Sequence, residues 1–385
     1  MQEWFGDWYQ KERSLIQLDL GESVLPVEFL VEEFESKNTT TIQPFWEEVA
    51  YLGTDADQES DRSAIETYQL ELPTPYADPP SLITFYSFKG GVGRTIHLAA
   101  YLFALLERAK EIDNPIKVLV IDADLEAPGL TYWDRLDGQQ STVTFIDFLE
   151  AYHYSPLPTQ ETLSLLAEEI KKSSRREGRS VFYFLPAFAR DEQLLDAPVL
   201  PQHLARSPEG EWTCSNAIYK LGKAINVDYI LIDLPTGINE ISSPFIFDPR
   251  LQRFLVTTLT KESLAGSNLV LKQIGGIFPA NGARNNSNTG IYFDPCIIVS
   301  LLTPQLKSLP EFGNALTALR NSYAQVDRIE ENDLFSKQLE VRKTDFSQEL
   351  LYVNSWEEAQ QKLSSTSIMS MARAWAASQR MPLRT

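Results

Sequence analysis

From residue 82 onward, short apolar runs alternate with segments of helical periodicity. Short runs with few polar positions are typical of parallel strands that are buried on both faces of a sheet. The six predicted strands are 82–88, 117–122, 181–187, 228–233, 253–257 and 296–301. The expected helices include one after residue 95 with a stripe of leucines, one over 214–225 and one over 261–273. Strands that alternate with helices predict an α/β fold with a doubly wound, mostly parallel sheet.

The first 80 residues have a different pattern. They carry 18 acidic and 4 basic residues, a net charge of −14, whereas the whole chain of 385 residues has a net charge of −19. Helices are expected near 1–17, 26–36 and 44–52. Residues 53–80 are first acidic and then rich in proline, so they are expected to form a linker.

This N-terminal extension has two interpretations. Its aromatic residues, among them Trp4, Trp8 and Trp46, are too frequent for a plain solvating tail. The extension is therefore expected either to pack on the rest of the chain as a helical decoration or to serve as a docking arm for a protein partner. The domain organisation predicted is an acidic extension and linker over 1–80, followed by an α/β domain with C-terminal helices over 81–385.

Composition excludes several kinds of site. The two cysteines, Cys214 and Cys296, exclude a disulfide framework and a four-cysteine zinc site. The three histidines lie far apart in the sequence and match no metal-ligand spacing. No apolar run reaches the ~20 residues that a membrane-spanning helix needs, and the first residues lack the layout of a signal peptide. A soluble, cytoplasmic protein without a transmembrane segment is expected.

A glycine-rich turn connects the first predicted strand to a helix. It reads Lys89-Gly90-Gly91-Val92-Gly93-Arg94-Thr95. Glycines let successive backbone N–H groups converge on phosphate oxygens, and the N-terminus of the following helix adds a partial positive charge. A hydroxyl at the position of Thr95 can ligate Mg²⁺. Strand, glycine-rich turn and helix together predict a phosphate-binding site.

Aspartates end two other predicted strands. Asp122 and Asp124 follow the run that begins at residue 117, and residues two apart in an extended chain point the same way. Asp233 ends a second run and is followed by Pro235-Thr236-Gly237. Open α/β sheets bind ligands at the carboxyl ends of their strands, so these carboxylates are expected near the glycine-rich turn. The alternative is that they only cap strand ends.

The turn and the two carboxylate segments together resemble the ParA/MinD family of P-loop ATPases of the SIMIBI class. That family has a deviant Walker A loop, and the turn is most similar to its KGGVGR-type variant. The resemblance covers residues 82–305 and implies a P-loop NTPase fold, ATP and Mg²⁺ as cofactors, and an ATP-dependent homodimer. It implies three catalytic residues: Lys89 reaching the partner's nucleotide, Arg94 in place of the lysine that meets the β- and γ-phosphates, and Asp124 positioning the attacking water.

The same resemblance implies the other site residues. The nucleotide would be bound by Gly90, Gly91, Val92, Gly93, Arg94, Thr95, Ile96 and Pro304. The metal would be held by Thr95, Asp122 and Asp233, and the switch residues would be Asp124, Pro235 and Gly237, with the Gly237 N–H sensing the γ-phosphate. The sequence departs from the family pattern at Phe88, where the leading glycine is missing, and at Arg94 and Ile96. Arginine can bind phosphate in a fork, but its larger planar group is expected to slow turnover.

The function that the resemblance implies is a slow Mg-ATP-dependent dimerisation switch for a partner in a bacterial regulatory or defence-like system. The alternatives are a DNA-partition ATPase of the ParA type and a non-catalytic module that binds nucleotide to present the acidic extension. Nucleic acid is disfavoured because the chain is acidic, although 171–179 is a basic run. That run is expected to be solvated, and a helix over 366–381 is expected to pack on the protein rather than touch membrane.

Overall fold

A computed structural model gives the structure of the chain. It describes residues 9–10, 15–19, 24–28, 39–41, 44–50, 67–138, 141–195, 212–277, 292–324, 339–379 and 381. The chain divides into two compact units, one of Met1–Thr40 with Ala64–Thr67, the other of Thr41–Ser63 with Tyr68–Thr385. The first half of the linker expected over 53–80, residues 53–66, lies outside the described residues, as do Trp4 and Trp8.

The first unit contains a three-stranded antiparallel sheet in the order β1-β2-β3. Its strands are β1 (Tyr9–Gln10), β2 (Leu15–Asp19) and β3 (Val24–Glu28). The helices predicted near 1–17 and 26–36 are therefore wrong for the described residues, and residues 29–36 lie outside them. The described residues pair as strands instead: β2 and β3 form an antiparallel register in which Ile16 faces Val27 and Leu18 faces Leu25.

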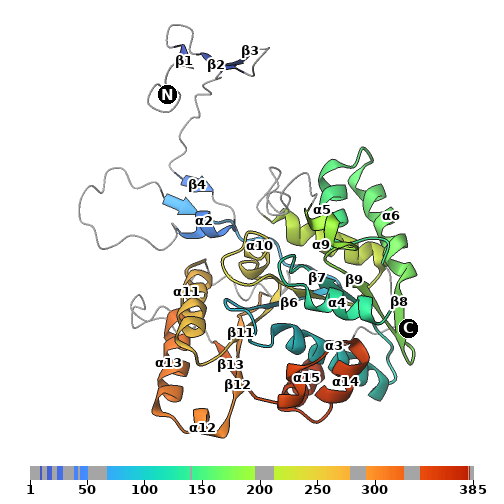
Figure 1. The fold of residues 1–385 in the computed structure, drawn as a ribbon, viewed down its shortest axis with the longest axis vertical. Coiled ribbons are helices and arrows are strands. Elements are labelled where there is room, and N and C mark those ends of the chain that lie inside the picture. Colours follow the sequence, from blue (N-terminus) through green and yellow to red (C-terminus); the bar gives the residue numbers. More distant parts are fainter. Residues whose placement is uncertain are drawn as a thin grey trace, which may run out of the picture. The chain divides into compact units, whose positions relative to one another are not determined.

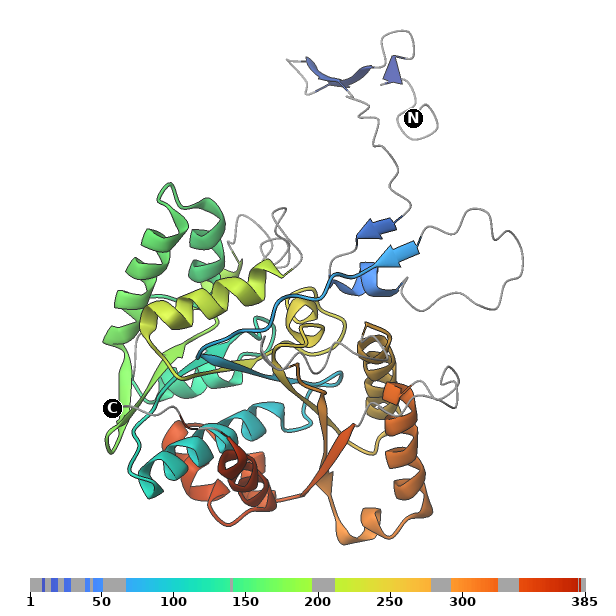
Figure 2. The same ribbon diagram turned by 180° about the vertical axis from the view of Figure 1, so that it is seen from behind.

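The second unit is built on an eight-stranded sheet in the order β13-β12-β11-β6-β10-β7-β9-β8 (Figures 1 and 2). All neighbouring strands are parallel except the pair β8 and β9. The strands are β6 (Ser81–Tyr86), β7 (Lys117–Asp122), β8 (Ser174–Glu177), β9 (Ser180–Leu185), β10 (Tyr229–Asp233), β11 (Gln252–Thr257), β12 (Cys296–Leu302) and β13 (Glu340–Asp345). The predicted α/β fold with a mostly parallel sheet is confirmed. The two edge strands β8 and β13 were not predicted.

Helices cover both faces of this sheet (Figures 1 and 2). Each face of the sheet has its own apolar core, so each face needs a cover of helices. In strand β6, Leu82 and Tyr86 are buried in the first core, and Ile83 and Phe85 are buried in the second. The second core is closed by α3 (Arg94–Glu111), α14 (Trp356–Leu363) and α15 (Ser367–Ser378). The first is closed by α5 (Phe145–Tyr154), α6 (Thr159–Lys172), α9 (Thr213–Ile225), α10 (Ser243–Ile246), α11 (Lys261–Ile277) and α13 (Pro310–Ala324).

The C-terminal helix α15 packs on α3, as the sequence predicted. Its Trp375 is 3% exposed and stacks near Tyr101 with ring centroids 4.6 Å apart. The Trp375 indole also donates to the Gln252 side chain at 3.0 Å. Within the described ranges, no helix combines the length and the apolar character needed to cross a bilayer.

Residues 44–50 and 68–80 of the N-terminal extension belong to the second unit. The helix expected near 44–52 is the short α2 (Trp46–Val49), and Phe45 and Val49 are buried beside it. Further along, the Trp212 indole donates to the Glu71 carbonyl at 2.9 Å. A two-stranded sheet of β4 (Thr39–Thr41) and β5 (Thr67–Gln69) completes the described elements of the extension. Trp46 and Val49 are part of the first apolar core, and Leu70, Leu72 and Tyr76 pack against it, as the packed interpretation predicts for these five residues.

Candidate functional site

The glycine-rich loop leaves the end of β6 and enters α3. Gly91 has φ +74° and Gly93 has φ +88°, a region that glycine adopts without strain. A Cβ atom added at Gly90 or Gly91 would meet nothing within 4 Å. The loop therefore presents bare backbone to open space at the N-terminus of a helix, which is the arrangement that binds anions.

Arg94 lies at the centre of the site. It is 6% exposed, and its Nη2 donates to Asp124 at 2.5 Å while its Nε donates to Asp233 at 2.5 Å. Burial alone would lower the pKa of Arg94, but the charges of Asp233 and Asp124 outweigh it and raise that pKa above its ordinary value. The guanidinium is therefore a permanent cation held by both carboxylates.

Thr95 is placed for a divalent cation. Its hydroxyl donates to Asp233 at 2.7 Å, which directs the proton to the carboxylate and leaves oxygen lone pairs free. No group of three histidine, cysteine or acidic residues in the described part of the chain is placed to hold a metal by itself. Mg²⁺ needs few protein ligands because it keeps several waters and binds substrate phosphates. Thr95 with Asp233 beside it therefore fits that ion.

Asp122 is engaged by a different partner. Its Oδ2 accepts from the backbone N–H of Thr131 at 2.8 Å and from the Thr131 hydroxyl at 2.9 Å. Burial and the nearby charge of Asp233 raise the pKa of Asp122 well above its ordinary value. Asp122 faces Asp233 across the paired strands β7 and β10, so all three predicted carboxylates meet at one end of the sheet.

The segment after β10 contacts both the loop and the first carboxylate segment. The Gly237 N–H donates to the Ser87 carbonyl at 3.2 Å, and Gly237 has φ +72°. Asn239 Nδ2 donates to Glu126 at 3.1 Å, which connects the two predicted switch segments. Pro235 is buried two residues after the end of β10. The role of Asn239 and Glu126 was not predicted from the sequence.

These elements surround a cavity of about 460 Å³. Among the predicted residues, Gly90, Gly91, Gly93, Arg94, Thr95, Ile96 and Asp124 line it. Arg94 Nη1 and the Ser87 hydroxyl are buried at this cavity and have no hydrogen-bond partner among the described residues. Buried polar groups are normally satisfied, so two unpaired donors fit a ligand rich in oxygen atoms, such as a phosphate.

Other predicted residues do not line this cavity. Val92 points into the core at 3% exposure, and Pro304 opens the short α12 (Pro304–Lys307) behind its N-cap residue Thr303. Lys89 is about half exposed and makes an ion pair with Glu262 at 3.6 Å. Asp122, Asp233, Pro235 and Gly237 surround the cavity residues without lining the cavity itself.

Eleven further lining residues were not predicted as site residues. They are Ser87, His97, Ala127, Thr236, Ser300, Leu301, Asp345, Ser347, Leu350, Leu351 and Ile368. The apolar members Leu301, Leu350 and Leu351 come from the end of β12 and from the short 3₁₀ helix η5 (Gln348–Leu351) after β13. The polar sequence of β13 gave no signal that the following segment would reach the glycine-rich loop.

His97 connects the loop to β13. One ring nitrogen, Nδ1, lies 2.7 Å from the Gly93 carbonyl, and the other, Nε2, lies 3.1 Å from the Thr344 hydroxyl. Burial lowers the pKa of His97 to about 4. The neutral ring therefore donates to Gly93 and accepts from Thr344, because only one of its nitrogens carries a proton.

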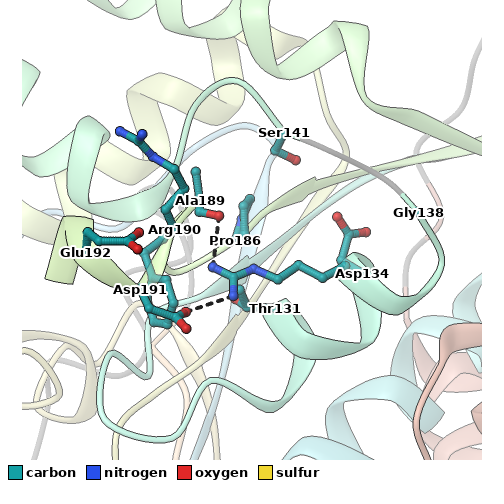
Figure 3. Close-up of a pocket in the computed structure, with 11 residues that line it drawn as sticks. Thr131, Asp134, Gly138, Ser141, Pro186, Ala189, Arg190, Asp191 and Glu192 are labelled. Carbon is teal, nitrogen blue, oxygen red and sulfur yellow. Dashed lines mark hydrogen bonds and ion pairs between the residues drawn. The ribbon is translucent and has the colours of Figure 1, made fainter.

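A larger cavity of about 630 Å³ lies beside α4 (Gly129–Leu136) and α7 (Asp191–Leu195) (Figure 3). Arg135 lines it and donates to the Ala189 carbonyl and to Asp191, both at 2.9 Å. Thr131 lines this cavity and also binds Asp122. No part of the glycine-rich loop lines it, so the smaller cavity is the candidate nucleotide site.

No protein-family model matches the sequence, and none of the curated proteins matches it either. Solved structures do match. A ParA family ATPase from Chlorobium tepidum has a TM-score of 0.49 and 16% identity, covering 78% of this chain and 100% of its own. The chain is similar in fold to ATPases of the ParA and MinD type.

Two other structures give the same result. Apo McdA from Cyanothece has a TM-score of 0.48 and 14% identity over 77% of this chain and 99% of its own. MinD from Pyrococcus horikoshii, solved with Mg-ADP, has a TM-score of 0.41 and 18% identity over 77% and 94%. Because all these identities are low, the function of this chain is argued from its own residues.

Proposed function

We propose that the chain binds Mg-ATP in the cavity of the glycine-rich loop, hydrolyses it slowly, and closes as a homodimer when ATP is bound. One observation carries this proposal: Arg94 and Thr95 of the loop meet Asp124 and Asp233 in one buried site. Arg94 and Ser87 line the same cavity, and each has a buried polar atom, Nη1 and Oγ, without a hydrogen-bond partner among the described residues.

Each residue has a proposed role in phosphate binding. The backbone N–H groups of residues 90–95 cradle the phosphates, and Arg94 turns its guanidinium toward the β- and γ-phosphates. Thr95 holds the cation, and Asp233 and Asp122 orient waters around it. Mg²⁺ supplies neutralisation of the negative charge that develops on the phosphates during hydrolysis.

Slow turnover follows from the position of Asp124. Its carboxylate must be free to orient a water, yet it accepts a hydrogen bond from Arg94. The bound phosphates compete for the same guanidinium, so Asp124 becomes available only when they win that competition. Electrostatic positioning of this kind supplies most of the rate in phosphoryl transfer.

The proposed base subsite is formed by the apolar residues that line the cavity. Leu301, Leu350 and Leu351 give it an apolar lining that suits a flat purine ring. Asp345 and Ser347 add polar groups at its edge. This subsite replaces the one expected at Pro304.

A non-catalytic nucleotide-binding module is the second candidate. It is favoured by the same Arg94–Asp124 bond, which would suppress hydrolysis if ATP could not break it. DNA binding has little support. In the basic run, Lys171 pairs with Glu168, Lys172 with Glu169, Arg175 with Asp134 and Asp137, and Arg179 with Asp113.

The test compares ATP binding, ATP turnover and mass in solution for wild type, Lys89→Ala and Asp124→Ala. Wild type should bind ATP and double its mass. Lys89→Ala should lose the mass change, and Asp124→Ala should bind ATP without turnover. The exposed residues Lys220 and Asp191 supply matched alanine controls. Binding with no turnover in wild type would favour the non-catalytic module, and no binding at all would end the proposal.

The proposed partner is a protein that contacts the N-terminal extension, in a bacterial regulatory or defence-like system. The net charge of −14 over residues 1–80 suits a basic protein surface. An infection assay with and without the gene, and capture of partners with and without residues 1–40, would test the setting and the partner separately.

A further inference from the structure

Two aromatic donors hold the segment that follows β10. The Tyr86 hydroxyl donates to the Gly237 carbonyl at 2.8 Å, and the Trp46 indole donates to the Asn239 carbonyl at 3.0 Å. Tyr86 belongs to the core sheet, whereas Trp46 belongs to α2 in the N-terminal extension, 193 residues before Asn239. Trp46 is thus a direct contact between the extension and the proposed nucleotide switch.

The Trp46 ring is firmly placed. It is 7% exposed, and its centroid lies 4.9 Å from that of Phe247 in an edge-to-face arrangement and 6.5 Å from that of Tyr86. Both views show α2 beside α10, the helix that directly precedes Phe247 (Figures 1 and 2). The indole N–H is therefore fixed by packing and not by the hydrogen bond alone.

The segment after β10 also contacts residues of the proposed phosphate site. The Gly237 N–H donates to the Ser87 carbonyl, and the Asn239 side chain donates to Glu126. One N–H group cannot donate fully to Ser87 and to a γ-phosphate at the same time. The arrangement described here is consequently the one without a γ-phosphate contact at Gly237.

We infer that Trp46 couples the N-terminal extension to the nucleotide state, an inference that rests on the proposed ATP-binding function. When the Gly237 N–H turns from Ser87 to the γ-phosphate, the carbonyls of Gly237 and Asn239 move with it. The Trp46–Asn239 bond then breaks and α2 loosens. Coupling between two sites is reciprocal. The Trp46–Asn239 hydrogen bond therefore weakens ATP binding by the same free energy by which bound ATP weakens this hydrogen bond.

Trp212 provides a matched control. Its indole N–H donates to the Glu71 carbonyl and so also ties the extension to the core. Trp212 precedes α9 and lines neither the nucleotide cavity nor the segment after β10. A change from tryptophan to phenylalanine removes one such bond at either position while it keeps an apolar ring.

The experiment is hydrogen–deuterium exchange of the full chain without nucleotide, with Mg-ADP and with Mg-imido-ATP. The reporter is the peptide over 44–50, in which the Val49 N–H bonds the Phe45 carbonyl at 2.9 Å. Exchange there should be about fivefold faster with imido-ATP than with ADP, the factor that one neutral hydrogen bond supplies. Calorimetry measures imido-ATP affinity in parallel.

Two variants test whether the exchange response depends on Trp46. Trp46→Phe should exchange quickly at 44–50 in all three conditions and bind imido-ATP up to about fivefold more tightly. Trp212→Phe should keep the wild-type response and affinity. Bound imido-ATP with unchanged exchange at 44–50, or equal behaviour of the two variants, would overturn the coupling alone. Failure of wild type to bind imido-ATP would overturn the proposed function and the coupling together.

Discussion

Arg94 donates a hydrogen bond to Asp124 across 2.5 Å inside the candidate site, although 30 residues separate them in the sequence. The Nε of the same guanidinium reaches Asp233. An arginine can hold two carboxylates because its donors are fixed in one plane, whereas a lysine presents a single ammonium group. The residue that departs from the usual loop sequence is thus the one that joins the two acids.

Replacing Arg94 by lysine should raise ATP turnover by about tenfold, which corresponds to ~1.4 kcal/mol in the activation barrier. Lysine lacks the forked Nε and Nη2 donors that hold Asp233 and Asp124, so we expect Asp124 to be freed to orient water. Phosphate release at saturating ATP measures the rate. Arg175→Lys is the control, because Arg175 also bridges two aspartates, Asp134 and Asp137, away from the loop. A turnover equal to or below that of wild type would contradict the proposed restraint on Asp124.

Replacing Gly266 by alanine should lower the free energy of unfolding by about 1–3 kcal/mol. A Cβ atom at this position on α11 would lie 1.9 Å from Cδ1 of Phe88, at the start of the glycine-rich loop. Gly313→Ala on α13 should be neutral or stabilising by up to about 1 kcal/mol, since a Cβ atom there meets nothing within 4 Å. Urea unfolding compares the two. Equal stability of both variants would show that Phe88 moves aside without cost.

Acidification should remove stability that depends on His97. Burial depresses the pKa of this residue to about 4 in the folded state, below its ordinary value of 6.5. Between these values the unfolded chain takes up a proton that the folded chain does not. The free energy of unfolding therefore falls as pH drops through this window, by up to about 3 kcal/mol.

Comparison with His97→Gln isolates this effect. The raised pKa of Asp122 has the opposite effect on the free energy of unfolding, because the folded state keeps the proton of this carboxyl to higher pH than the unfolded state does. This effect is present in wild type and in His97→Gln, so it cancels in the comparison. The difference in free energy of unfolding between wild type and His97→Gln should become smaller as pH falls from about 6.5 to about 4. A gap that is constant with pH in urea unfolding would refute a buried neutral His97.

Replacing Leu350 by alanine should weaken ATP binding by about fivefold, since roughly one buried CH₂ group is worth that factor. Turnover at saturating ATP should not change, because the lost contact serves the base equally in ground and transition states. Tyr352→Ala is the control: Tyr352 lies two residues further on, is 73% exposed and does not line the cavity. Equal affinities in the two variants would place the base elsewhere.

Local sequence was sufficient for the six inner strands of the large sheet, for the glycine-rich loop and for the aspartates at the strand ends. The apolar runs at 82–88, 117–122 and 228–233 have few polar positions, which predicts strands buried on both faces. The spacing of the glycines in 89–95 predicts the turn between the first strand and the helix. The edge strands β8 and β13 escaped prediction because they are polar: their residues are mostly half-buried or exposed. The helices expected in the first 36 residues failed because hairpin pairing replaced the helical pattern.

The sequence by itself determined that a glycine turn, a threonine and three aspartates would sit at the carboxyl ends of parallel strands, because backbone geometry and strand direction are local properties. The tertiary structure alone decided their partners: Arg94 with Asp124 and Asp233, His97 with a hydroxyl 247 residues away, and Trp46 with Asn239. Such pairs form only when segments that are far apart in the sequence pack against each other. The residue pattern within one segment does not specify which other segment it will contact.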